Sequence, residues 1–257
     1  MTLSRPDPPA PDRRLIYALD GMSLDEALAA VRVLGRVVKV FKIGPGLVYE
    51  GGLGVAARIA RAAPGGDAAV FLDLKSWDIP ETLRNTLEAI VRHGGDAVAL
   101  ATLHSFGLAP AAVHAFRARR GAGGRPRLLG VTLLTSQDQS DLAALGIGLG
   151  VEDFVLAMAR RAQAAGCDGI VCSGHEVARV RGELPALLTV VPGIRPAAAG
   201  QDDQKRIVTP RQAILAGADH LVVGRPIRQA PDPLQAATAI QAEIQAALAE
   251  RNATQTS

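Results

Sequence analysis

Cysteine, aromatic side chains and long apolar runs are all scarce in this chain of 257 residues. The two cysteines, Cys167 and Cys172, lie five residues apart and lack the accompanying Cys and His pairs of a zinc site. Cysteine is among the residue types most often buried, so we expect both to be packing residues in a protein of the reducing cytoplasm. A structural zinc site is therefore not expected.

The sequence also predicts neither a membrane span nor a surface that binds nucleic acid. No stretch reaches the roughly 18 apolar residues of a membrane span. Residues 1–14 are rich in proline and lack the apolar core of a signal peptide, so we expect a disordered leader there and a flexible tail over 253–257. The net charge is +3, but the arginines are scattered and aromatic residues make up only 3%. A nucleic-acid surface would need clustered cations and stacking aromatics.

What the chain does contain is a repeated alternation between short apolar runs and longer segments with helical periodicity. Eight apolar runs follow one another: 15–20, 37–44, 68–75, 97–103, 127–134, 169–173, 187–195 and 220–225. Segments such as 23–35, 81–94, 151–166 and 232–252 repeat apolar residues at intervals of three and four. Ser23 and Glu26 have the spacing of a helix capping box.

Apolar strands that alternate with amphipathic helices predict an α/β protein with a parallel sheet covered by helices. Eight such units in about 240 residues favour a closed (β/α)8 TIM barrel, a single domain over residues 15–252. The alternative is a doubly wound open sheet, which would place a glycine fingerprint after the first strand, and residues 15–23 contain none. In a barrel, functional side chains gather where the strands end.

A cluster of charged residues, Asp73, Lys75 and Asp78, lies at the end of the third apolar run, in FLDLKSWDIPET. Asp73 and Lys75 are two residues apart, so on a strand their side chains point to the same side. Two carboxylates flanking one ammonium would keep Lys75 protonated, ready to donate a proton to a developing carbanion. A carboxylate near a substrate carboxylate would also destabilise the ground state. Spacing alone equally permits a structural salt bridge.

A phosphate site is predicted at the other end of the chain. Barrels that handle phosphorylated ligands usually bind the phosphate with the loops after strands seven and eight. These loops supply Arg195, Gly224 and Arg225, which combine guanidinium groups with a backbone that a ligand can approach closely. The long polar loop after strand seven, which contains Gln204, has the character of a lid.

The segment 71–82 is similar to the D-x-K-x-x-D-I-P-x-T signature of the orotidine 5′-monophosphate decarboxylase family. Seven further segments match that family in the same order along nearly the whole chain: 18–20, 41–44, 131–136, 168–173, 191–195, 202–210 and 222–227. The resemblance implies decarboxylation of orotidylate to uridylate without metal or cofactor, the last step of pyrimidine nucleotide synthesis.

The resemblance also implies roles for individual residues. Lys75 would protonate C6 of the pyrimidine, Asp73 would lie near the departing carboxylate, and Asp78 would enter the active site of the neighbouring subunit of a homodimer. The implied substrate contacts are Asp20 and Lys42 with the ribose, Thr82 with the ribose of the partner site, Thr135 and Ser136 with the base, Arg195, Gly224 and Arg225 with the phosphate, and Gln204 with both phosphate and pyrimidine.

Two segments depart from the family pattern. Ser76-Trp77 follows the lysine where the family usually has an aromatic or aliphatic residue and then His. The segment 104–107 reads His-Ser-Phe-Gly where many members have His-Ala-x-Gly-Gly. These departures concern the packing behind Lys75 and the shape of the fourth loop, and we expect His104 to have a structural role.

Two other functions remain open. Sugar-phosphate aldolases and decarboxylases of the same fold also carry Asp-x-Lys-x-x-Asp, but they need further carboxylates at the strand ends to hold magnesium. Here strands two and four end in Lys42 and His104. A barrel that only binds nucleotides would be expected to lack a member of the charged set, and none is missing.

Overall fold

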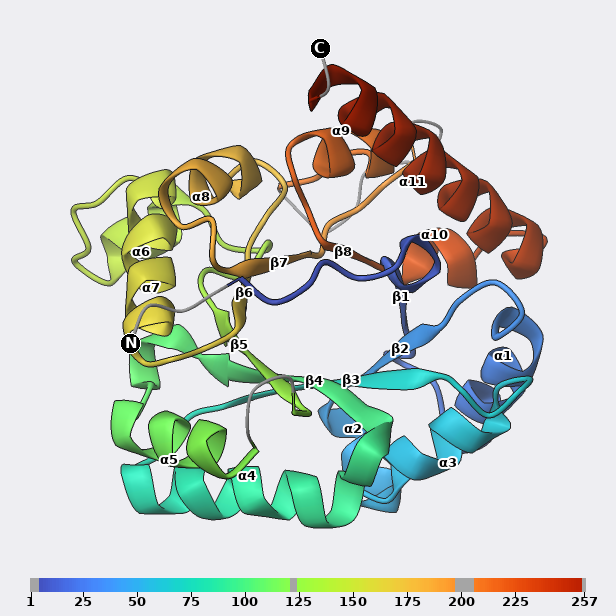
Figure 1. Cartoon of the computed structure of the whole chain (residues 1–257), viewed down its shortest axis with the longest axis horizontal. Coiled ribbons are helices and arrows are strands. Elements are labelled where there is room, and N and C mark those ends of the chain that lie inside the picture. Colours follow the sequence, from blue (N-terminus) through green and yellow to red (C-terminus); the bar gives the residue numbers. More distant parts are fainter. Residues whose placement is uncertain (1–4, 121–123, 197–205, 256–257) are drawn as a thin grey trace.

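Eight parallel strands close into a barrel in the order of the chain, and β8 pairs with β1 (Figure 1). The computed structural model describes residues 5–120, 124–196 and 206–255. The strands are β1 (Leu15–Ala18), β2 (Val40–Ile43), β3 (Ala69–Ser76), β4 (Val98–His104), β5 (Arg127–Val131), β6 (Gly169–Val171), β7 (Leu188–Val191) and β8 (His220–Val223). Each strand overlaps one of the eight expected apolar runs, which confirms the single-domain (β/α)8 barrel.

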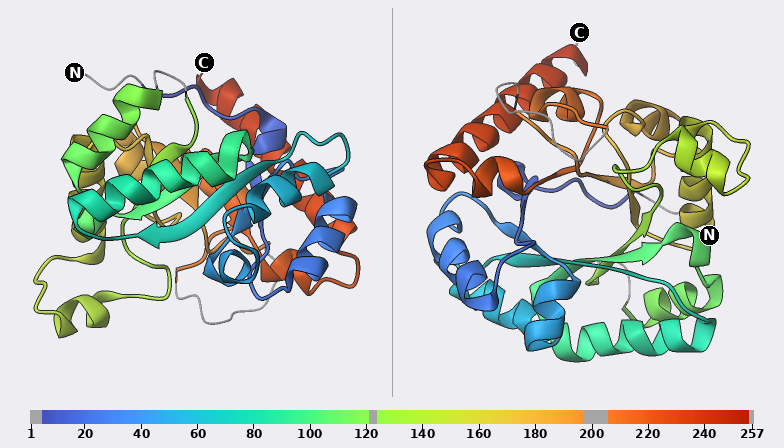
Figure 2. Two further views of the ribbon diagram at one scale, coloured as in Figure 1. Left: turned by 90° about the horizontal axis from the view of Figure 1, so that it is seen from below. Right: turned by 180° about the vertical axis from the view of Figure 1, so that it is seen from behind.

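Helices surround the barrel on the outside (Figure 2). They are α1 (Leu24–Leu34), α2 (Pro45–Gly51), α3 (Val55–Ala62), α4 (Pro80–Gly94), α5 (Pro110–Arg120), α6 (Gln139–Ala144), α7 (Val151–Ala164), α8 (Val177–Glu183), α9 (Pro210–Leu215), α10 (Arg225–Arg228) and α11 (Pro233–Gln255). Short 3-10 turns form at η1 (Pro11–Arg13), η2 (Gly95–Ala97) and η3 (Ser105–Gly107). The expected capping box of Ser23 and Glu26 opens α1.

The apolar core has two parts, because successive strand residues face opposite sides of the barrel wall. Leu15 and Tyr17 of β1 belong to the large cluster between strands and helices. Ile16 and Ala18 belong to a smaller cluster with Phe71, which fills the barrel interior. The two cysteines are buried and unpaired, which confirms their expected role in packing.

The ends of the domain differ from the expectation. Residues 11–14 were expected to be part of a disordered leader, but they form η1 and bury the side chain of Arg14. The guanidinium of Arg14 donates to the backbone carbonyls of Ala218 and Asp219, and Arg5 forms an ion pair of 2.7 Å with Asp219. These long-range contacts fix Arg5 and Arg14 against the barrel. At the other end, α11 continues to residue 255, three residues past the expected boundary.

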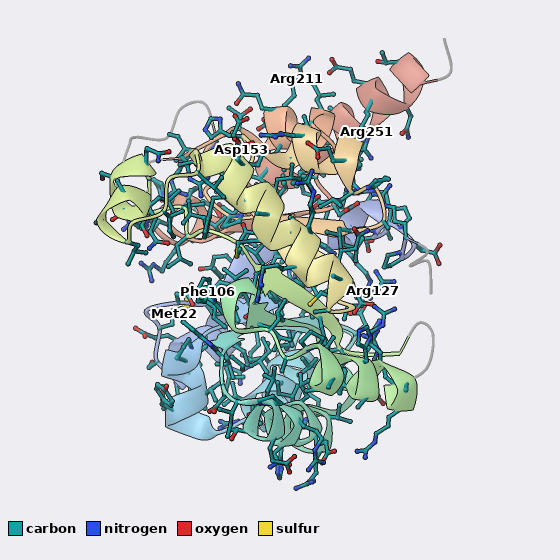
Figure 3. All side chains as sticks on the ribbon, turned by 90° about the vertical axis from the view of Figure 1, so that its left-hand side faces the viewer. Met22, Phe106, Arg127, Asp153, Arg211 and Arg251 are labelled. Carbon is teal, nitrogen blue, oxygen red and sulfur yellow. The ribbon has the colours of Figure 1, made fainter. Side chains whose placement is uncertain are left out.

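Residues at the two ends of the barrel can be located in the side view. Phe106 lies just beyond the end of β4 and Arg127 at the start of β5, at opposite ends of the barrel (Figure 3). At the end where the strands finish, the segment that contains α6 projects well beyond the barrel (Figure 2, left). Among the described residues, no helix is both long enough and apolar enough to cross a membrane.

Candidate active site

A cavity of about 530 Å³ opens where the strands end. Nine of the predicted site residues line it: Asp20, Lys42, Asp73, Lys75, Thr135, Ser136, Arg195, Gly224 and Arg225. Asp78 and Thr82 do not line it, and Gln204 lies outside the described residues. The barrel therefore brings together residues that are up to about 200 positions apart in the sequence, as the strand-end rule predicts.

Four charged side chains of alternating sign form a row along one wall of the cavity. The ammonium of Lys42 lies 2.5 Å from Asp20 Oδ2 and 3.3 Å from Asp73 Oδ2. On the other side, Lys75 Nζ lies 2.9 Å from Asp73 Oδ1. Within one chain the arrangement thus reverses the expected one, since two ammonium groups flank Asp73 rather than two carboxylates flanking Lys75. This row holds the two cations close together through the carboxylate between them.

Asp73 remains ionised although its side chain is only 13% exposed. Burial alone would raise the pKa of this carboxyl group, but the charges of Lys42 and Lys75 and hydrogen bonds from Lys75 and Thr102 outweigh it, so the pKa is lowered. A ligand in the cavity therefore meets a fixed negative charge. Lys75 is 37% exposed at its side chain, so its ammonium reaches the open space.

A bulge in β3 presents Lys75. Between the pairs Leu72–Ala101 and Ser76–Leu103, three residues of β3 face the single residue Thr102 of β4. Lys75 takes a φ of 51°, and among the described residues it is the only one other than glycine with a positive φ. Such a backbone conformation is strained and is typical of functional sites. Asp73 and Lys75 do face the same cavity, but through this bulge rather than through regular strand alternation.

The predicted phosphate residues lie together at the ends of β7 and β8. Arg195 is 7% exposed, and its guanidinium donates to the backbone carbonyl of Ile194 at 2.9 Å. Gly193 has a φ of 76°, a conformation that glycine adopts without strain. Gly224 precedes Arg225, the first residue of α10. Guanidinium groups beside glycine backbone form a site suited to a phosphate.

Asp78 and Thr82 are exposed residues that do not line the cavity. Asp78 Oδ1 accepts a hydrogen bond of 2.7 Å from the amide of Ile79, and both Asp78 and Thr82 are exposed. The neighbouring Trp77 and Ile79 are 60% and 66% exposed. This short segment combines apolar side chains with a carboxylate.

Four contacts near the cavity were not anticipated from the sequence. Thr102 forms hydrogen bonds with both Asp73 and the amide of Lys75. The only feature of the sequence that marked Thr102 was that it is a hydroxyl residue within an apolar run. Arg228 lines the cavity and donates to the carbonyl of Asp20. Arg206 forms an ion pair of 2.5 Å with the buried Glu176, and nothing in the sequence indicated that these two residues pair.

His104 has the structural setting that we expected for it. Burial and the nearby Lys75 charge lower the pKa of its imidazole, and the neutral ring accepts a hydrogen bond at Nδ1 from the amide of Phe106. In the described ranges, no three His, Cys, Asp or Glu side chains are grouped as metal ligands would be.

Comparison with known proteins shows the family to which this chain belongs. The family model described as "Orotidine 5′-phosphate decarboxylase / HUMPS family" matches residues 13–240. A protein named orotidine 5′-phosphate decarboxylase from Rhodopseudomonas palustris (strain BisB5) is 48% identical over 237 residues, which cover 92% of this chain and 96% of that protein. A protein of the same name from Methylobacterium sp. (strain 4-46) is 46% identical over 243 residues, 93% of this chain and 98% of that protein.

A solved structure extends the agreement to three dimensions. The crystal structure of orotidine 5′-phosphate decarboxylase from Lactobacillus acidophilus superposes with a TM-score of 0.72 at 32% identity, and the match covers 90% of this chain and 99% of that one. Sequence and fold thus agree over nearly the full length of the relatives. The chain belongs to the orotidine 5′-phosphate decarboxylase / HUMPS family.

Proposed function

We propose that this protein decarboxylates orotidine 5′-monophosphate to uridine 5′-monophosphate, using neither a metal ion nor another cofactor. One observation carries the proposal: the row of alternating charges ends in the ammonium of Lys75, on a strained bulge beside a cavity that arginines also line. Orotidylate has a carboxylate at one end and a phosphate at the other. The cavity offers a proton donor and guanidinium groups for these two ends.

In the proposed reaction, Lys75 supplies a proton and Asp73 supplies a negative charge. The bond between C6 and the carboxylate carbon breaks, its electron pair stays on C6, and carbon dioxide leaves. Lys75 donates its proton to C6, and the resulting amine regains a proton from water. Asp73, held ionised by Lys42 and Lys75, would repel the substrate carboxylate but not the neutral product carbon dioxide. Repulsion that is relieved in the transition state accelerates the step.

The remaining cavity residues would bind the parts of the substrate that do not react. The carboxylate of Asp20 is 55% exposed, so it can accept hydrogen bonds from ribose hydroxyls beside Lys42. Arg195 and Arg225 would hold the phosphate, with backbone donors near Gly224. The proposed contacts to the base are Thr135, Ser136 and Gln204. Binding energy at the phosphate would hold the base against Lys75.

We further propose a homodimer in which each subunit completes the site of the other. Asp78 and Thr82 are exposed and do not line their own cavity, and the exposed apolar residues Trp77 and Ile79 adjoin Asp78 in the sequence. An exposed apolar segment of this kind suits a second copy of the chain. In the dimer, Asp78 would lie near Lys75 of the partner subunit and provide a second carboxylate beside that lysine, in addition to Asp73.

The direct test is the ultraviolet absorbance of orotidylate during incubation with the wild type and with Lys75→Ala. We expect the wild type to convert orotidylate, and Lys75→Ala to lose about 100- to 10,000-fold in kcat because the proton donor is gone. The variant should still bind uridylate, since most binding contacts remain.

A matched control is Lys39→Ala, which removes a lysine that pairs with Asp67 outside the cavity. It should retain wild-type turnover. If the wild type leaves orotidylate unchanged at high enzyme concentration, the proposed function is wrong. Equal turnover in the wild type and Lys75→Ala would instead refute the role of the lysine.

A further inference from the structure

The two segments that depart from the family pattern, 76–77 and 104–107, pack against each other. The indole of Trp77 stacks on the imidazole of His104, with ring centroids 5.2 Å apart and planes at 20°. Phe106 meets the same indole edge to face at 5.7 Å and 69°. Favourable aromatic pairs have these separations and geometries. Aromatic side chains of these two segments therefore form one unit.

Gly107 leaves the space that the indole occupies. A Cβ atom at this position would lie 1.7 Å from Cδ1 and 1.9 Å from Nε1 of Trp77, far inside van der Waals contact. The φ of Gly107 is not positive, so its backbone would accept an L residue. Glycine is needed here for the indole and not for the turn.

The partners of Trp77 are themselves anchored. His104 ends β4 and accepts a hydrogen bond at Nδ1 from the amide of Phe106. Arg161 on α7 donates to the carbonyl of Phe106 at 3.2 Å and to that of Ser105 at 3.5 Å. The surface on which the indole stacks is thus tied to both the barrel wall and an outer helix.

Trp77 lies two residues after Lys75 and directly before Asp78. The positive φ of Lys75 costs free energy, and such a conformation persists only where the surrounding structure fixes it. On one side of the bulge Thr102 bonds the Lys75 amide at 2.8 Å, and on the other the stacked indole fixes the chain as it leaves β3.

We propose that Trp77 is a positioning residue, clamped by His104, Phe106 and Gly107, that holds the bulge in the conformation that presents Lys75 to the cavity. The proposal rests on the proposed function, in which Lys75 is the proton donor. Because the indole is 60% exposed, its removal should leave the barrel folded. The effect of its loss should fall on the geometry of the bulge.

The test uses Gly107→Ala, which displaces the indole without altering it. The matched control is Gly182→Ala in α8, where an added Cβ would meet no atom within 4 Å. Trp77 is the only tryptophan in the sequence, so tryptophan fluorescence reports on this indole alone. We expect acrylamide to quench the emission more efficiently in Gly107→Ala than in the wild type or Gly182→Ala.

Two further measurements separate positioning from mere packing. Exchange of the Lys75 amide hydrogen, followed by NMR, should accelerate by about tenfold or more in Gly107→Ala and in Trp77→Ala. With orotidylate as substrate, kcat of Gly107→Ala and of Trp77→Ala should fall by about 10- to 100-fold while KM changes by less than about threefold. A misplaced proton donor affects the transition state more than substrate binding. Trp77→Phe, which keeps a ring to stack on His104, should restore most of kcat. The double variant Gly107→Ala/Trp77→Ala should have a kcat no lower than that of Trp77→Ala.

The outcomes are distinguishable from failure of the proposed function. If quenching changes in Gly107→Ala but Lys75 exchange does not, the clamp does not hold the bulge and the proposal is overturned. It is also overturned if kcat in Trp77→Ala equals that of an active wild type. If the wild type itself fails to convert orotidylate, the function falls, whereas the exchange rate still decides whether Trp77 fixes the Lys75 backbone.

Discussion

The hydroxyl of Thr102 donates a hydrogen bond of 3.1 Å to the carboxylate of Asp73 on the neighbouring strand. The same oxygen accepts the amide hydrogen of Lys75 at 2.8 Å. Thr102 is buried, and three residues of β3 face it across the bulge. One uncharged side chain on β4 therefore fixes both ends of the bulge that carries the charged pair.

Thr102→Val should impair both turnover and stability. Valine has nearly the shape of threonine but leaves the Lys75 amide and one Asp73 oxygen without this partner, which costs about 1–3 kcal/mol of unfolding free energy. We expect kcat on orotidylate to fall by about 10- to 100-fold, since a small displacement of catalytic groups has effects of that size. Urea unfolding and steady-state kinetics measure the two effects.

Two control variants isolate the hydroxyl of Thr102. Thr102→Ser keeps the hydroxyl and should retain most of kcat. Thr132→Val removes another buried hydroxyl, which bonds the carbonyl of Val171, and should cost stability without a comparable loss of kcat. Wild-type kcat in Thr102→Val would show that the bulge does not depend on this hydrogen bond.

The fold could be predicted because each strand of a parallel barrel is buried on both faces and leaves an apolar run in the sequence. The strand ends were less well determined. The run 187–195 extends beyond β7, which ends at Val191, because apolar residues continue into the cavity wall after the ladder stops. Apolar character reports burial, whereas strand limits depend on backbone pairing that the sequence does not display.

The sequence predicted which residues at the strand ends line the site, but it did not predict the local geometry of the site. The residues at the strand ends do line one cavity, since topology alone brings them there. The bulge at Lys75 has no signature, because a positive φ at lysine is imposed by tertiary contacts such as that of Thr102. The order of residues 11–14 was missed for the same reason: their partners lie about 200 positions away, beyond any local pattern.

Metal dependence separates the proposed reaction from that of the magnesium-dependent sugar-phosphate enzymes. We expect dialysis against a chelator to leave kcat on orotidylate unchanged, because the proposed proton donor is Lys75 and the proposed electrostatic group is Asp73. Turnover before and after chelation, with magnesium added back to one sample, measures this. A complete loss of activity that magnesium restores would refute the metal-free mechanism.

His220 should make the fold sensitive to acid. Burial lowers the pKa of its imidazole from 6.5 to about 4, and Nδ1 lies 3.0 Å from the carbonyl of Arg13. The unfolded chain binds a proton at this residue below pH 6.5, whereas the folded protein does so only near pH 4. Stability should therefore fall as the pH drops through this window, by about 3 kcal/mol in total from this group.

Urea unfolding of His220→Gln between pH 7 and pH 4 tests this expectation. Glutamine does not titrate and can still donate to the Arg13 carbonyl, so the variant should lose less stability on acidification than the wild type. The control is His93→Gln, which replaces an exposed histidine of α4 and should follow the wild-type pH dependence. Parallel pH profiles for His220→Gln and the wild type would contradict the assignment.

Subunit exchange tests whether Asp78 completes the site of a partner. Lys75→Ala and Asp78→Ala should each be nearly inactive alone. In a mixed dimer of the two, one site combines an intact Lys75 with an intact Asp78, while the other site lacks both. An equimolar mixture that exchanges freely should recover about a quarter of the wild-type activity, because half of the dimers are hybrids with one working site. The recovered activity should rise in step with the fraction of hybrid dimers, which mass spectrometry of differently tagged subunits measures. A mixture that stays inactive after exchange is complete would show that Asp78 acts within its own chain or not at all.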